Sequence, residues 1–256
     1  MTATRTLAGF AADCGGTLHG ADRAFSGIST DTRTLAAGEV FVALTGPRFV
    51  ASEFVGAAAA AGAAAVVIPS RQDAAIAQIV VPDTLAALTQ AAAAWRRRFT
   101  LPLIGVAGSN GKTTAKEMTA AILAAAGRCL ATRGNLNNHI GVPVTLLRLD
   151  PVHDFAVIEI GANHPGEVAA LAEIARPDIG LVTNAGAEHL EGFGSLEGVA
   201  RAEGELFAGI EAEATAVINA DDEFASLWRE MARGRQVRFG LGAAAEFSAG
   251  DIRHEV

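Results

Sequence analysis

The sequence predicts an α/β protein with a small N-terminal α/β domain and a larger domain whose parallel sheet carries helices on both faces. Two observations predict this fold class. Residues 101–114, LPLIGVAGSNGKTT, form an apolar strand, a glycine-punctuated turn and the polar start of a helix. Apolar segments at 155–160, 179–183 and 215–219 are each followed by a stretch with helical periodicity. Such alternation is typical of parallel strands buried on both faces.

The N-terminal domain is expected to cover residues 1–82. A short helix is predicted at 6–13, followed by a strand at 39–44. A second helix is predicted at 52–61 with Ser52 as its N-cap, and a buried strand at 64–68 precedes Pro69.

Residues 83–100 are expected to form a linker helix between the domains. This helix ends in three arginines, Arg96 to Arg98, which raises the question of nucleic-acid binding. Cations also suit the negative end of a helix dipole, and we interpret the triplet as a solvated helix terminus.

The central domain is predicted to cover residues 101–256. Helices are expected after the glycine turn and after the three later strands, at 115–126, 166–175, 196–208 and 223–232. In parallel sheets of this kind, ligands bind at the carboxyl ends of the strands. The candidate site residues lie at these strand ends.

Composition excludes several classes of protein. The 256 residues are 50% hydrophobic, but charged residues or glycines interrupt every apolar run before the roughly 18–20 residues that a membrane span needs. The N-terminus lacks the apolar region of a secretory signal, so a cytoplasmic location is expected. Two cysteines, Cys14 and Cys129, provide no disulfide framework. A net charge of −8 argues against nucleic-acid binding, although a local site with a metal could still hold a nucleotide.

The turn before the helix at 115–126 has the features of a phosphate cradle. Backbone N–H groups at a helix N-terminus favour anions, Lys112 could reach terminal phosphates, and the Thr113 hydroxyl could ligate Mg²⁺. Val106 stands where the strict motif has its first glycine. Lys112 and Lys116 are the only lysines of the sequence, which argues against chance. The alternative is a strand-to-helix turn in which the glycines only allow the chain to turn tightly. The nucleotide candidates are Gly108, Ser109, Asn110, Gly111, Lys112, Thr113 and Thr114.

Two further residues are candidate metal ligands. Glu159 lies near the end of an apolar strand, where a carboxylate is costly to bury unless it is paired or bound to a metal. His189 lies in a glycine-rich loop after the strand at 179–183, at the same edge of the sheet. The alternatives are an exposed glutamate without a role and a solvated loop histidine. The following helix carries Glu197, Glu203 and Glu205. This acidic helix could supply a further carboxylate ligand to a metal, or it could be only a solvated face.

Asparagines mark two more strand ends. Residues 132–143, TRGNLNNHIGVP, contain Asn135, Asn137 and Asn138, which suit either turns and caps or a polar substrate. Asn219 follows the strand at 215–219 and could contact the edge of a base, or its segment could cap a helix.

Together these segments resemble the Mur ligases of peptidoglycan synthesis. The resemblance rests on GVAGSNGKTTAKEM, GNLNNHIGVPVTLLRL, VIEIGANHPGEV, AEHLEGFGSLEGVARAEGELF and INADD, and on the N-terminal STDTRTLAAGEVFVALTGPRF. These phrases span nearly the whole chain and are more specific than the phosphate-binding turn alone.

The resemblance implies ATP-dependent amide formation through an acyl phosphate, with ATP and Mg²⁺ required. It is strongest to the members that add D-alanyl-D-alanine to UDP-N-acetylmuramoyl-tripeptide. Lys112, Thr113 and Glu159 would hold phosphates and metal, His189 would ligate a second metal, and Asn219 would contact adenine. The uridine nucleotide would bind in residues 1–82, at Asp31, Thr32, Arg33 and Arg48, and we expect a monomer.

Two departures from the family pattern stand out. Glu203 occupies a position where many members carry a carbamylated lysine, so it could contact the second metal directly or through water. The chain ends at Val256, before the further C-terminal domain of the family, and we expect the central domain to be incomplete. Two alternatives remain: a sister Mur or folylpolyglutamate-type ligase with another amine, or a fragment that binds nucleotide and UDP substrate without turnover.

Overall fold

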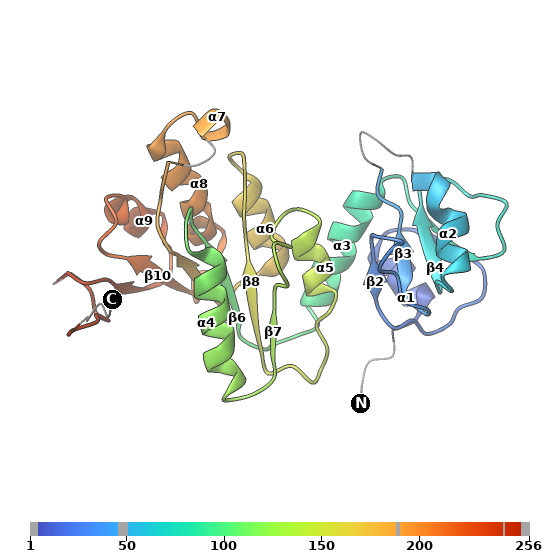
Figure 1. The fold of residues 1–256 in the computed structure, drawn as a ribbon, viewed down its shortest axis with the longest axis horizontal. Helices are drawn as coiled ribbons and strands as arrows, with labels where there is room; N and C mark the ends of the chain where they lie inside the picture. The colour runs from blue at the N-terminus through green and yellow to red at the C-terminus, as the bar shows by residue number, and fades with distance from the viewer. Residues whose placement is uncertain (1–4, 46–50, 188–189, 243, 252–256) are drawn as a thin grey trace, which may run out of the picture. The chain divides into compact units, whose positions relative to one another are not determined.

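The structure is a computed structural model that describes residues 5–45, 51–187, 190–242 and 244–251. The chain forms two compact units (Figure 1). The first comprises Met1–Phe99 and Pro143–Pro151, and the second comprises Thr100–Val142 and Val152–Val256. The segment predicted as a linker helix, residues 83–100, thus lies almost wholly in the first unit.

The first unit is built on a five-stranded sheet with the order β1-β5-β4-β3-β2. Strands β2 to β5 are parallel and β1 pairs antiparallel with β5, with Thr17 opposite Val80. The strands at 39–44 and 64–68 are confirmed as β3 and β4, whereas β1, β2 and β5 were not predicted. The bounds are β1 Thr17–His19, β2 Ile28–Ser29, β3 Val40–Val42, β4 Ala65–Ile68 and β5 Ala77–Val80.

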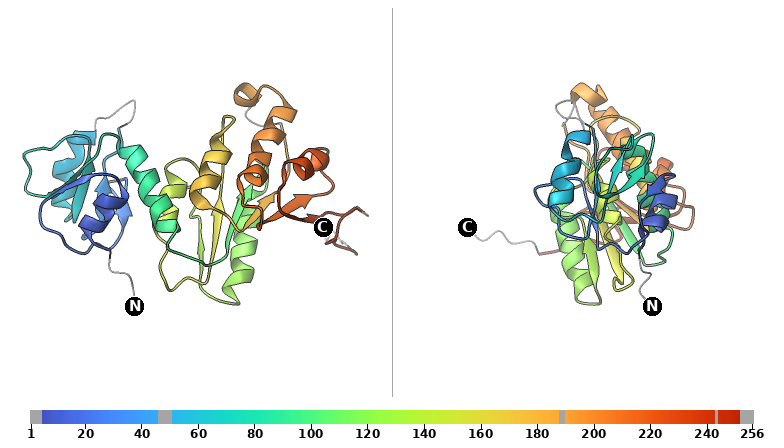
Figure 2. Two further views of the ribbon diagram at one scale, coloured as in Figure 1. Left: turned by 180° about the vertical axis from the view of Figure 1, so that it is seen from behind. Right: turned by 90° about the vertical axis from the view of Figure 1, so that its right-hand side faces the viewer.

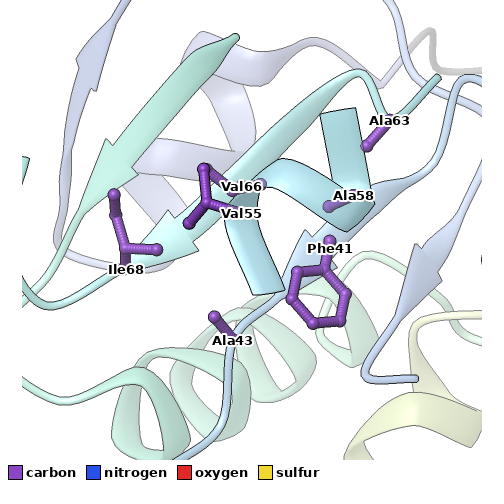
Figure 3. Packing of buried hydrophobic residues seen from close by; sticks show 7 residues of the cluster. All are labelled: Phe41, Ala43, Val55, Ala58, Ala63, Val66 and Ile68. Atoms are coloured by element: carbon purple, nitrogen blue, oxygen red, sulfur yellow. The ribbon is translucent and has the colours of Figure 1, made fainter. Parts of the chain in front are cut away.

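Helix α2 (Val55–Ala60) and strands β3 and β4 enclose a buried apolar cluster in this unit (Figure 3). A short 3₁₀ helix, η1 (Ala51–Phe54), precedes α2, whose N-cap is Phe54 without a side-chain capping bond. The predicted cap at Ser52 was therefore wrong, because the α-helix begins three residues later. The cluster consists of Phe41, Ala43, Val55, Ala58, Ala63, Val66 and Ile68.

Helices α1 (Leu7–Asp13) and α3 (Thr84–Arg96) lie wholly in the first unit, and residues 143–146 of α5 (Gly141–Leu146) also belong to it. Thr6 caps α1 by accepting the Gly9 N–H, and Asp83 caps α3 by accepting the N–H groups of Leu85 and Ala86.

The arginines at the end of α3 are not a uniformly solvated terminus. Arg96 is only 5% exposed, and its guanidinium donates a 2.7 Å bond to the Phe99 carbonyl. Arg98 pairs with Asp13 at 2.7 Å and stacks over Trp95. The interpretation of the triplet as solvated was wrong for Arg96, whose side chain packs into the unit instead.

The second unit contains six parallel strands in the order β11-β10-β9-β6-β8-β7. The strand predicted at the start of residues 101–114 and those predicted at 155–160, 179–183 and 215–219 are confirmed, while β7 and the edge strand β11 were not predicted. The bounds are β6 Leu103–Ala107, β7 Cys129–Ala131, β8 Phe155–Glu159, β9 Ile179–Val182, β10 Thr215–Asn219 and β11 Arg235–Phe239.

Helices lie on both faces of this sheet (Figures 1 and 2). Ile104 and Val106 pack toward α4, whereas an added Cβ at Gly105 would lie 3.3 Å from Leu206 of α8 on the opposite face. This arrangement confirms the predicted fold class. The bounds are α4 Lys112–Ala124, α5 Gly141–Leu146, α6 Glu167–Ala175, α7 Leu190–Phe193, α8 Leu196–Gly209 and α9 Ala225–Met231. No helix in the described part of the chain is long and apolar enough to cross a membrane.

Candidate active site

The turn between β6 and α4 is shaped by two glycines with positive φ. Gly108 has φ +120°, and an added Cβ would lie 2.2 Å from the Thr183 hydroxyl oxygen, so only glycine fits. Gly111 has φ +79° and is the N-cap of α4 without a side-chain capping bond. The first turn of α4 therefore presents backbone N–H groups and the positive end of its dipole, which suit a phosphate.

The loop after β9 braces this turn from the side. The Asn110 N–H donates to the Asn184 side-chain oxygen at 3.0 Å, and the Asn184 amide donates back to the Asn110 carbonyl at 2.9 Å. Thr183 donates a second bond to the Asn110 carbonyl at 2.7 Å, and the Gly186 N–H donates to the Ser109 hydroxyl at 2.8 Å. These bonds hold the turn against the loop that follows β9.

Three glutamates of α8 have three different environments. Glu203 is 3% exposed, and its carboxylate accepts the Gly108 N–H at 2.7 Å, which ties the turn to α8. Glu205 accepts the N–H groups of Gly166 and Ala169 at the start of α6. Glu197 pairs with Arg201 on the exposed face of α8. Glu203 is thus the α8 carboxylate that reaches the turn between β6 and α4.

Lys112 folds back over the turn from which it comes. Its ammonium donates to the Gly108 carbonyl and, at 2.9 Å, to the Ser109 carbonyl. The lysine that the motif assigns to phosphates is therefore positioned at the turn.

Glu159 ends β8 on the face toward α4 and is only 2% exposed. One carboxylate oxygen accepts the Thr113 hydroxyl at 3.0 Å, and the other accepts the Asn137 side-chain amide at 2.8 Å. The alternative of an exposed glutamate was wrong. A carboxylate and a hydroxyl in contact form a pair of hard oxygen ligands, which is the donor type that Mg²⁺ prefers. The residues present therefore fit the expected metal.

Lys116 lies one helical turn after Thr113 and is 0% exposed. Its ammonium donates to the Thr132 carbonyl at 2.9 Å, pairs with Glu117 at 2.6 Å and lies 4.0 Å from Glu159. The Thr132 hydroxyl in turn accepts the Glu159 backbone N–H at 2.9 Å.

The asparagines have separate roles. Asn137 contacts Glu159, whereas the Asn138 side chain accepts the N–H groups of Ile140 and Gly141 before α5. Asn135 is exposed. Of the two roles considered for these asparagines, a turn or cap and a substrate contact, Asn138 therefore has the role of a cap.

Asn219 lies at the carboxyl end of β10. Its amide donates to the Thr183 carbonyl at 2.9 Å, and its oxygen accepts the Asp221 N–H at 3.0 Å. The helix that follows, α9, has Phe224 as its N-cap without a side-chain capping bond. Asn219 thus joins β10 to the loop that contacts the turn between β6 and α4.

The expected uridine-nucleotide residues belong to the first unit. Asp31 follows β2, and its carboxylate accepts bonds from the Arg33 backbone N–H and guanidinium. These bonds lower the pKa of Asp31 to about 2. Thr32 is partly exposed between them, and Arg48 lies outside the described residues.

His189 also lies outside the described residues, so its expected role as a metal ligand stays a prediction. Among the residues that are described, no group of three or more His, Cys, Asp or Glu side chains could hold a metal ion. The Thr113–Glu159 pair is therefore the core of the candidate metal site in this part of the chain.

A family model for the Mur ligase middle domain matches residues 106–255. The match begins in β6 and includes the turn, Glu159 and α8. This chain belongs to the Mur ligase family.

The Mur ligase relatives include UDP-N-acetylmuramoyl-tripeptide–D-alanyl-D-alanine ligases from several bacteria. The chain is 46% identical to the one from Escherichia coli K12 over 239 residues, which is 93% of this chain and 53% of that protein. It is 38% identical to the one from Bacillus subtilis, over 77% of this chain and 44% of that protein. The chain spans about half the length of the curated relatives it matches.

Solved Mur ligase structures have the same fold. A crystal structure of MurF from Acinetobacter baumannii has a TM-score of 0.88 at 36% identity, over 95% of this chain and 54% of that one. A MurF ligase from Thermotoga maritima in complex with ADP has a TM-score of 0.76 at 28% identity, over 85% of this chain and 51% of that one.

Several residues of the candidate site were not singled out from the sequence. Asn184 and Thr183 contact the turn from a strand end more than seventy residues away, as the separations of 74 and 73 show. Thr132 reaches Glu159 across neighbouring strands. Lys116 had one signal, because it is one of only two lysines in the sequence.

Proposed function

We propose that this chain carries the nucleotide site and the UDP-substrate unit of a ligase that joins D-alanyl-D-alanine to UDP-N-acetylmuramoyl-tripeptide. The observation that carries the proposal is the contact between Thr113 and Glu159 beside the open N-terminus of α4. The relatives at 46% and 38% identity bear the name of this activity. A cytoplasmic location agrees with the two free cysteines of the described chain, Cys14 and Cys129.

A free carboxylate is a poor electrophile, so the reaction activates it first. An oxygen of the tripeptide carboxylate attacks the γ-phosphorus of ATP, the bond to the β-phosphate oxygen breaks, and ADP leaves. The amine of D-alanyl-D-alanine then attacks the acyl phosphate, losing a proton as inorganic phosphate departs. Catalysis of this kind depends on positioning and on neutralising phosphate charge.

The residues of the site have separate roles in that chemistry. The N–H groups at the start of α4 would hold phosphate oxygens, and Lys112 would exchange its bonds to the Gly108 and Ser109 carbonyls for bonds to phosphate. Thr113 and Glu159 would hold Mg²⁺, which neutralises phosphate charge when bound. Asn219 is proposed to contact adenine, and His189 and Glu203 to hold a second metal directly or through water.

The experiment is phosphate release from ATP by this chain with UDP-N-acetylmuramoyl-tripeptide, offering D-alanyl-D-alanine, L-alanine, D-glutamate or a diamino acid in turn. Release only with D-alanyl-D-alanine supports the proposal. Release with another amine would support a sister ligase instead. Nucleotide binding without release under any condition would show a binding fragment that needs the remaining half of the ligase for turnover.

A further inference from the structure

The buried lysine of α4 has no role in the proposed reaction so far. Lys116 is the buried residue of α4, a helix whose residues are all described, and its side chain is 0% exposed. Burying an ammonium group is costly unless charged and polar partners compensate it. The position of Lys116 therefore calls for an explanation beyond packing.

The partners of Lys116 point to Glu159. Glu117, which pairs with Lys116 at 2.6 Å, is 64% exposed and could be solvated without the lysine. Glu159 is 2% exposed and receives its two side-chain hydrogen bonds from neutral groups, the Thr113 hydroxyl and the Asn137 amide. Among the described residues, Lys116 makes the ion pair with Glu159, at 4.0 Å. The buried carboxylate and the buried ammonium compensate each other.

Lys116 also acts on the backbone of Glu159. Its ammonium donates to the Thr132 carbonyl at 2.9 Å, and the Thr132 hydroxyl accepts the Glu159 N–H at 2.9 Å. Thr132 follows β7 and Glu159 ends β8, so this connection joins the carboxyl ends of two adjacent strands. Both the side chain and the main chain of Glu159 are thus fixed from one point on α4.

We propose that Lys116 is a positioning residue that holds the Glu159 carboxylate against the Thr113 hydroxyl, through Thr132 and the buried ion pair. Thr113 and Lys116 are three residues apart, so they lie on the same face of α4. Lys112 takes the phosphates and Lys116 orders the metal-binding oxygens. This inference rests on the proposed function, because it assigns Lys116 to the metal side of the same nucleotide site.

The test compares ADP binding by calorimetry in Mg²⁺ and in EDTA for the chain and for three variants: Lys116→Met, Glu159→Gln and the double variant. Methionine keeps the length of the side chain and removes its charge. We expect Lys116→Met to weaken ADP binding in Mg²⁺ by about tenfold or more, the effect typical of residues that orient metal ligands. Binding in EDTA should change little. In the Glu159→Gln background, Lys116→Met should cause no further loss, because the group it positions is gone.

Several outcomes would overturn the inference. Lys116→Met could lower ADP affinity equally in the unmodified chain and in Glu159→Gln, or as much in EDTA as in Mg²⁺. Either result would show that Lys116 has a general structural role. If Mg²⁺ strengthens ADP binding as much in Lys116→Met as in the unmodified chain, the inference about Lys116 is refuted, while the proposed function is not. If the unmodified chain binds ADP no better in Mg²⁺ than in EDTA, the proposed function fails and the inference with it.

A second pair of variants keeps the proposal testable if Lys116→Met does not fold. Thr132→Val removes the hydroxyl that accepts the Glu159 N–H, and Thr132→Ser keeps it. We expect the valine variant to lose the Mg²⁺-dependent part of ADP affinity and the serine variant to retain it; equal behaviour would refute the proposal. Arg201→Met, which removes an exposed cation of α8, is the control for loss of positive charge.

Discussion

Glu159 and Thr113 meet at 3.0 Å because a strand end and a helix start converge on one face of the sheet. Val157 packs toward α4, and side chains alternate along a strand, so Glu159 points to the same side. The carboxylate is therefore held at the start of α4 by protein contacts alone, from Thr113 and Asn137. Preorganisation of this kind is what a metal–nucleotide site needs.

Replacing Thr113 by valine tests this arrangement directly. Valine keeps the shape and removes the oxygen, so we expect ADP affinity in Mg²⁺ to fall by about 10- to 100-fold, with little change in EDTA. Thr113→Ser, which keeps a hydroxyl, should retain most of the affinity. Calorimetry of the two variants measures the difference, and equal losses would argue against ligation by Thr113.

Gly108 is the residue of the turn that tolerates substitution least. An added methyl group would lie 2.2 Å from the Thr183 oxygen and 2.8 Å from its backbone nitrogen, at φ +120°. We expect Gly108→Ala to abolish ADP binding and to lower the free energy of unfolding. The control is Gly134→Ala, where φ is +55° and no atom lies within 4 Å. That variant should lose only the roughly 1–2 kcal/mol of a left-handed residue. Denaturant melts compare the two, and similar losses would contradict the close approach to Thr183.

The burial of Cys14 leads to a prediction about how stability and thiol labelling depend on pH. Burial raises the pKa of this thiol from 9.0 to about 12. A raised pKa in the folded state stabilises the protein below the unfolded value, and this stabilisation is lost as the pH rises from about 9 toward 12. At pH 8, iodoacetamide should therefore modify half-buried Cys129 well before Cys14, while both should react at similar rates in guanidinium chloride. Mass spectrometry follows the two sites, and rapid native labelling of Cys14 would contradict its burial.

At the residue scale, the sequence identified the groups that stand next to each other in motifs. Lys112 and Thr113 were predicted because G-K-T follows a strand, and Glu159 because a carboxylate ends an apolar run. Asn184, Thr132 and the contact of Glu203 with Gly108 were not predicted, because they form across strands and helices up to 95 residues apart. Periodicity contains no information about such pairs.

Among the elements, each strand that was not predicted is short or contains a polar residue; β3 is short too, but it lies within the longer apolar segment at 39–44. Strands β6, β8, β9 and β10 are four or five residues long and largely apolar, and each was predicted. Strands β1 and β2 have three and two residues, too few for a periodic signal. Strand β11, RQVRF, contains two arginines that suit an edge position, and it pairs with β10 at the edge of the sheet. Pairing with a neighbouring strand, and not the local sequence pattern, thus determines that such short or polar segments form strands.

The N-cap of α3 provides a prediction at this scale. Asp83 accepts the N–H groups of Leu85 and Ala86 at 2.8 and 3.0 Å. Asp83→Ala should lower the free energy of unfolding by about 1 kcal/mol, whereas Asp83→Ser should retain most of the stability. Urea unfolding of both variants measures the difference. If alanine and serine proved equivalent, the cap would contribute nothing.

For the whole molecule, the two tryptophans report on different units. Trp95 belongs to the first unit and Trp228 to the second, which also contains every residue of the phosphate-binding turn. Saturating ADP with Mg²⁺ at about 100 times its Kd should stabilise the second unit by about 2.7 kcal/mol. In a Trp95→Phe variant, the fluorescence melt of Trp228 should therefore shift upward with the ligand. In Trp228→Phe, the melt of Trp95 should shift less, and an equal shift would show that the units unfold together.

The assignment of Pro143–Pro151 to the first unit has a consequence for dividing the chain. The Leu149 carbonyl accepts bonds from the Trp95 indole at 3.0 Å and from the Arg5 guanidinium at 2.9 Å. A gene cut after Phe99 would leave those two donors without their acceptor, and the excised piece would lack part of its own interior. A usable half-molecule would instead need residues 143–151 supplied as a graft or a co-expressed peptide.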